Sequence, residues 1–122
     1  MNRMARATGT IVTGVIVLFV LAGAGPSEAA GARCREELVD GGAHTSRTRA
    51  PINVMIANRS AGVIRVYWLD PRGARILYNT LSPGASYVQQ TFVGHPWVVT
   101  NMQEDCIRIY YPQPYNPQLV IG

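Results

Sequence analysis

Short stretches of alternating hydrophobic and polar residues, separated by turn signals, dominate the chain from residue 52 onward. In the first of them Ile52, Val54 and Ile56 alternate with less hydrophobic neighbours. A repeat of two residues is the period of a β-strand with one buried face, whereas an amphipathic helix repeats every 3.6 residues. Turn residues interrupt the pattern roughly every ten residues, and no helical period follows. The pattern predicts an all-β fold, a small antiparallel β-sandwich of about six to seven strands.

The same pattern predicts where the strands lie. Asp70-Pro71-Arg72-Gly73 has the composition of a tight turn, because Pro favours the second position and Gly the last. We expect the side chains of Ile64, Val66 and Trp68 on one face of the second strand, and those of Ile107, Ile109 and Tyr111 on one face of the sixth. The tail could form a seventh strand or a frayed end. The expected strands span residues 52–57, 63–69, 75–78, 86–93, 97–101 and 106–111.

The N-terminus has the three parts of a secretory signal. Arg3 and Arg6 precede an apolar, uncharged stretch at 11–25, and small residues follow at Ser27 and Ala29. This order predicts a signal peptide at 1–29. A retained membrane anchor is the alternative, but the apolar stretch of about 15 residues is shorter than the roughly 20 that a spanning helix needs. We therefore expect a secreted protein, or one of the periplasm or cell envelope.

The two cysteines, Cys34 and Cys106, lie far apart in the sequence. An even number of cysteines in an exported protein favours a disulfide, and two free thiols are the alternative. Residues 30–50 are polar and weakly patterned, so we expect an N-terminal arm that this bond ties to a domain at 51–122. A closed loop of about 70 residues would stabilise the fold by ~4 kcal/mol in the chain-entropy model.

Charge and motifs exclude several functional classes. The formal net charge is +4, and every basic residue is an arginine. The arginines are scattered and not interleaved with aromatic residues, so we expect no nucleic-acid partner. Nucleophile, paired-carboxylate, phosphate-loop and metal-ligand motifs are missing, and His44 and His95 are the two histidines. We expect no enzymatic activity, no cofactor and no metal. Cys106 acting as a nucleophile with His95 remains a minor alternative.

Several segments together carry a resemblance to a known family. The segments are Asn58-Arg59-Ser60, Val66-Tyr67-Trp68-Leu69-Asp70, Tyr78-Asn79-Thr80-Leu81-Ser82-Pro83-Gly84 and Gly94-His95-Pro96-Trp97. Aligned without a gap, this run resembles the β domain of the von Hippel–Lindau tumour suppressor family, a peptide-binding β-sandwich. The resemblance implies that 51–122 is a β domain of this family with a C-terminal tail, and the predicted signal peptide implies that this stand-alone domain is exported. It lacks the helical domain that recruits ubiquitin-ligase subunits, so we expect no ubiquitin-ligase activity.

The resemblance also implies a binding site. In the family, two Trp, a Tyr, a Ser and a His line a pocket for the 4-hydroxyproline of an extended peptide. The matching residues here are Trp68 and Trp97, Tyr78 and His95, with Thr91 in place of the Ser. Aromatic walls would hold the pyrrolidine ring, and Thr91 and His95 could hydrogen-bond its hydroxyl. Such a site rejects proline because its own buried polar groups would then be unpaired. Pairing of the peptide with a sheet edge would add affinity.

Other interpretations of these residues stay open. Trp68 could belong to the core, and the chain would then be a non-catalytic structural or envelope β-sandwich with no ligand pocket. His95 lies between a Gly and a Pro, which predicts an exposed position or a pocket rim. A small enzyme would need a second polar group near His95, such as Asp70 or Glu104. Asn58-Arg59-Ser60 also fits a glycan acceptor, although the resemblance puts it at a strand-to-turn corner.

Overall fold

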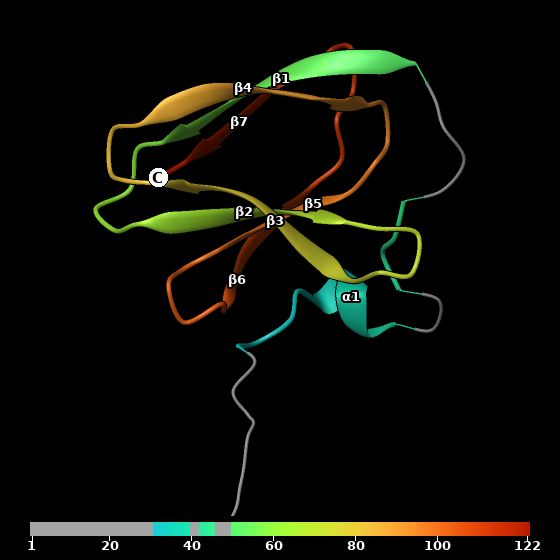
Figure 1. Ribbon diagram of the computed structural model, residues 1–122, viewed down its shortest axis with the longest axis horizontal. Coiled ribbons are helices and arrows are strands. Elements are labelled where there is room, and N and C mark those ends of the chain that lie inside the picture. The colour runs from blue at the N-terminus through green and yellow to red at the C-terminus, as the bar shows by residue number, and fades with distance from the viewer. Residues whose placement is uncertain (1–30, 40–41, 46–49) are drawn as a thin grey trace, which may run out of the picture.

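A computed structural model describes residues 31–39, 42–45 and 50–122. Two β-sheets pack face to face, and a short helix lies on the outside of one of them (Figure 1). This confirms the predicted all-β sandwich. The predicted signal peptide at 1–29 lies outside the described residues, and the division between arm and domain at residue 50 stays a prediction. The elements are α1 (Arg35–Leu38), β1 (Pro51–Asn58), β2 (Ile64–Leu69), β3 (Arg75–Leu81), β4 (Ser86–Phe92), β5 (Trp97–Thr100), β6 (Cys106–Tyr110) and β7 (Gln118–Ile121).

The three-stranded sheet has the order β4-β1-β7, and the four-stranded sheet has the order β3-β2-β5-β6. All neighbouring strands are antiparallel except β1 and β7, which are parallel. The tail is therefore a strand, and Leu119 and Ile121 of β7 are buried against the core. The parallel pair departs from the expected antiparallel topology, because the chain crosses from β6 in one sheet to β7 in the other.

The core lies between the inner faces of the two sheets, meaning the faces turned toward each other. Val54 and Ile56 of β1 are each 1% exposed and pack against Ile64 and Val66 of β2. The alternation at the start of the domain thus predicted the core face correctly. The third strand extends past its predicted end to Leu81, since its backbone pairs with β2 as far as Ile64.

The outer face of the four-stranded sheet is also covered, which the alternation did not predict. Tyr67 is only 5% exposed and belongs to a second apolar cluster with Leu69, Val98 and Cys34. The N-terminal arm lies over this face and contains the single turn of α1, a segment too short to show a helical period. The Cys34–Cys106 disulfide joins the arm to β6, as predicted.

A β-bulge interrupts the expected alternation in β6. Val99 pairs with Arg108 and Thr100 pairs with Cys106, so Ile107 is an extra residue. The bulge lets Cys106 share the outer face with Ile109, next to Cys34. The core residue of β6 is consequently Tyr110, whereas Ile107 and Tyr111 are 43% and 41% exposed.

Asn58 organises the corner between β1 and β2. Its side chain is fully buried, and Nδ2 donates hydrogen bonds to the carbonyl oxygens of Gly62 and Leu81 at 2.8 and 2.9 Å. Its Oδ1 accepts a hydrogen bond from the Ser60 amide. Asn58 Nδ2, the atom that would carry a glycan, is therefore already used in hydrogen bonds inside the protein. This supports the interpretation of Asn58 as a strand-to-turn corner residue. Within residues 31–39, 42–45 and 50–122, no helix is long and apolar enough to cross a membrane.

Candidate binding cavity

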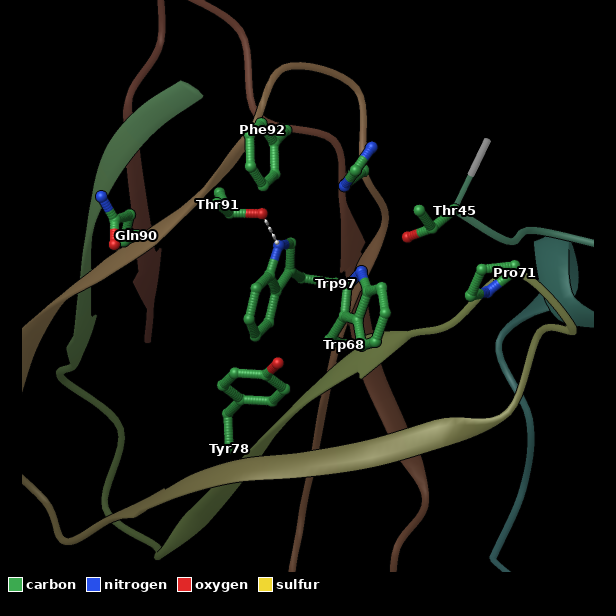
Figure 2. Close-up of a pocket in the computed structure, with 9 residues that line it drawn as sticks. Thr45, Trp68, Pro71, Tyr78, Gln90, Thr91, Phe92 and Trp97 are labelled. Carbon is green, nitrogen blue, oxygen red and sulfur yellow. Dashed lines mark hydrogen bonds between the residues drawn. The ribbon is translucent and has the colours of Figure 1, made fainter. Parts of the chain in front are cut away.

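A cavity of about 380 Å³ opens between β2 and β3 on one side and β4 on the other. It brings together all five residues that the sequence predicted for a peptide site. We refer to it as the aromatic cavity (Figure 2). Its lining consists of Thr45, Trp68, Pro71, Tyr78, Gln90, Thr91, Phe92, His95 and Trp97.

Three aromatic side chains form one wall of the aromatic cavity. Trp68 of β2 and Trp97 of β5 are directly paired across the two strands. Tyr78 of β3 contacts both rings edge to face, with centroids 5.0 Å from Trp97 and 6.3 Å from Trp68. Tyr78 is 50% exposed and Trp97 only 2%, so Tyr78 lies at the mouth and Trp97 at the floor.

A second β-bulge directs Tyr78 into the aromatic cavity. Asn79 pairs with Val66 and Leu77 pairs with Tyr67, which leaves Tyr78 as the extra residue of β3. Tyr78 and Leu81 are three positions apart, so a regular strand would place them on opposite faces. The bulge lets Leu81 enter the core while Tyr78 still faces the two Trp rings.

Thr91 is held in place by the floor of the aromatic cavity. The indole Nε1 of Trp97 donates a hydrogen bond to Thr91 Oγ1 over 3.0 Å, and both residues are buried (Figure 2). This bond satisfies the buried indole N–H. The hydroxyl proton of Thr91 is not used by it, so Thr91 can still donate to a ligand.

His95 is buried in the lining of the aromatic cavity, whereas the sequence predicted an exposed position or a pocket rim. It is only 5% exposed, and its ring packs against Phe92 at 5.3 Å between centroids. The turn that carries it folds inward, because the His95 amide donates to Phe92 O and the Gly94 amide donates to Pro112 O. His95 Nε2 is buried and has no hydrogen-bond partner among the described residues. An unpaired buried nitrogen typically costs ~1–3 kcal/mol, so this atom is a candidate ligand contact.

Comparison with protein families agrees with this geometry. The model of the VHL beta domain family matches residues 44–109, more than half of the chain. The chain belongs to the VHL beta domain family. The match contains β1 to β5, most of β6 and the whole lining of the aromatic cavity. No curated protein matches the chain.

Four lining residues of this VHL beta domain were not predicted from the sequence. Gln90 and Phe92 flank Thr91 in β4, and strand alternation turns both away from the face of Thr91, so the pattern did not predict them in the lining. Pro71 lies in the turn after β2, and Thr45 comes from the N-terminal arm. Thr45 carried no sequence signal, because a residue in a weakly patterned segment reaches the cavity only through long-range contacts.

Asp70 and Glu104, the acids that the sequence analysis suggested as polar partners of His95, both have other partners. Asp70 Oδ1 accepts hydrogen bonds from the amides of Arg72 and Ala74, within its own turn. Glu104 accepts a hydrogen bond from the Tyr67 hydroxyl and forms an ion pair with Arg65 at 3.6 Å. Neither lines the aromatic cavity. Cys106 is held in the disulfide and is not available as a nucleophile.

Proposed function

We propose that this VHL beta domain binds an extended peptide segment and holds a ring side chain of it in the aromatic cavity. The supporting observation is that the cavity combines apolar walls with one buried polar atom, His95 Nε2, that has no hydrogen-bond partner among the described residues. Concave sites of this kind, mostly apolar with a few converging polar groups, are typical ligand sites. A protein or peptide partner also agrees with membership of the family.

We propose 4-hydroxyproline as the ring. The pyrrolidine ring is apolar and suits the faces of Trp68, Tyr78 and Trp97, while its hydroxyl could pair with His95 Nε2. Thr91 could donate a second hydrogen bond to the same hydroxyl. Proline would leave His95 Nε2 buried and unpaired, so it should bind more weakly by ~1–3 kcal/mol, or roughly fivefold to more than a hundredfold.

The free strand edges beside the aromatic cavity support binding of an extended segment. β4 ends the order of the three-stranded sheet, and β3 ends that of the four-stranded sheet. Both contribute residues to the cavity. A peptide running along either edge could pair with unused backbone groups while one of its side chains enters the cavity.

We further propose that the protein works outside the cytosol, without catalysis. The Cys34–Cys106 disulfide supports an oxidising compartment, such as the extracellular space or the cell envelope. No group of three or more metal-ligating side chains occurs within the described part of the chain.

One observation favours a second candidate function, that of a structural or envelope module without a ligand. Trp97 is 2% exposed and its N–H is already satisfied by Thr91, as expected of a core residue. In that case Trp97 and Thr91 would only stabilise the fold, and the aromatic cavity would bind no peptide.

The two candidates are separated by calorimetric titration of the full chain with matched proline and 4-hydroxyproline peptides. The binding proposal expects the hydroxylated peptide to bind at least about fivefold more tightly. His95→Phe should abolish that preference and leave stability unchanged or higher, since it removes the unpaired nitrogen. Thr100→Val is the control, because Thr100 is buried but does not line the cavity. Binding of neither peptide would favour the structural module.

A further inference from the structure

The N-terminal arm reaches the aromatic cavity from outside the sandwich. Thr45 is 5% exposed and lines the cavity together with Pro71 and His95. Figure 2 shows Thr45 beside Pro71, at the opposite end of the cavity from Gln90. No strand carries Thr45, so this part of the wall depends on how the arm is held.

Hydrogen bonds fix Thr45 against the end of β2. Its amide nitrogen lies 3.1 Å from the carbonyl oxygens of both Leu69 and Asp70. Its hydroxyl donates to Leu69 O over 2.7 Å. Because a hydroxyl has a single proton, Thr45 Oγ1 can offer only acceptor capacity to a ligand. Thr45 therefore suits a ligand that presents a hydroxyl or a peptide N–H at this end of the cavity.

Other described residues of the arm are anchored on the outer face of the four-stranded sheet. Cys34 is 3% exposed and covalently bound to Cys106 of β6. Glu37 accepts hydrogen bonds from Arg75 Nε at 3.0 Å and Arg75 Nη2 at 2.8 Å. Ala43 packs against the cluster under the arm, and its amide donates to Glu36 O. These contacts connect the disulfide to the segment that ends in Thr45.

The disulfide is the covalent link in this anchorage. Among the described residues of the arm, the four residues of α1 are the only regular structure, and one helical turn is not stable by itself. A segment with little regular structure has a low local unfolding free energy unless something ties it down. Loss of the disulfide should therefore loosen the arm before it affects the inner core.

We propose that the arm is part of the binding site, with Thr45 as a ligand-contacting residue that the Cys34–Cys106 disulfide positions. The chemistry of the ligand rests on the proposed function, whereas the link from disulfide to cavity wall does not. A dithiol reductant supplies two electrons and two protons, the S–S bond breaks to give two thiols, and the reductant itself becomes a disulfide. The redox state of the Cys34–Cys106 bond thereby controls the position of Thr45 in the wall of the aromatic cavity.

The link is tested without any ligand, by amide and indole NMR of the full chain in its oxidised and dithiol-reduced forms. We expect reduction to change the signals of residues 42–45 and of Trp97, and to leave those of β1 and β7 in place. Unchanged cavity signals would overturn the proposal. Collapse of the whole spectrum would overturn it as well, because the disulfide would then hold the entire fold and not the arm.

The contact is tested in the oxidised chain with a 4-hydroxyproline peptide as the probe. Thr45→Val should weaken binding about fivefold, the equivalent of one ordinary hydrogen bond. Thr100→Val is the matched control, since Thr100 is also buried and donates its hydroxyl to a backbone carbonyl, that of Asn101. Equal affinities of the two variants would refute the contact. If the unaltered oxidised chain binds no peptide, the proposed function fails, while the ligand-free comparison still decides whether the disulfide positions the arm.

Discussion

The hydrogen bond between Trp97 and Thr91 gives the sharpest test of how the cavity floor is built. Thr91→Val keeps the shape of the side chain but removes Oγ1, which accepts the hydrogen bond from the Trp97 indole at an N···O distance of 3.0 Å. Trp97 is 2% exposed, so water cannot replace the lost acceptor without opening the floor. A buried donor left unpaired costs about 1–3 kcal/mol. For a domain of this size, each kcal/mol corresponds to a fall in Tm of roughly 4–8 °C.

Urea and thermal unfolding, followed by near-ultraviolet circular dichroism, would measure this loss in the full chain. Faster hydrogen exchange of the Trp97 indole N–H in Thr91→Val would confirm that the loss of stability arises from this hydrogen bond. Thr91→Ser is the matched control, because it keeps the hydroxyl and removes one methyl group, at a cost of about 0.8 kcal/mol. If Thr91→Val is no less stable than Thr91→Ser and leaves indole exchange unchanged, the bond does not hold the floor and this reasoning fails.

Three further predictions concern other parts of the molecule. Burial alone would raise the pKa of Glu37, but hydrogen bonds from Arg75, the Cys34 amide and Arg33 outweigh it and lower that pKa below 4.5. The stabilisation is therefore present above pH 4.5 and lost as the pH falls further, so arm amide signals should change in acid in the unaltered chain and much less in Glu37→Gln. Asn58→Ala should destabilise the fold by ~1–3 kcal/mol in urea unfolding, whereas mass spectrometry after expression in a glycosylating host should find Asn58 unmodified. Tyr78→Ala should weaken peptide binding with little loss of stability, since Tyr78 is half exposed, whereas Trp97→Ala should cost ~3–5 kcal/mol.

Local patterning explains why much of the fold was predictable. The alternation of β1 identified Val54 and Ile56 as core residues, and both are buried. The Cys34–Cys106 pair followed from an even cysteine count in a chain for which we predict export, and the bond is present. The residues implied by the family resemblance meet in one cavity: Trp68, Tyr78 and Trp97 lie on the neighbouring strands β2, β3 and β5 of one sheet, and Thr91 lies on β4 of the other.

The features that were missed depend on contacts between distant segments. The burial of Tyr67 was not predicted, because alternation indicates which residues share a face but not what covers that face. The arm covers that face. His95 was expected at an exposed position or a pocket rim, yet it is buried, and its turn is bonded to the segment after β6 through the Gly94 amide and Pro112 O. The two β-bulges, at Tyr78 and Ile107, shift the strand register by one residue, a change that no local sequence signal marked.

His95 Nε2 is the atom on which the proposed function depends most directly. Its imidazole ¹⁵N chemical shift in the full oxidised chain, measured with saturating 4-hydroxyproline peptide and with the matched proline peptide, reports whether it gains a hydrogen bond. We expect a clear change with the hydroxylated peptide and little with the other, because only the ring hydroxyl can pair with this buried nitrogen. An unchanged shift with both peptides would contradict hydroxyproline recognition by the aromatic cavity.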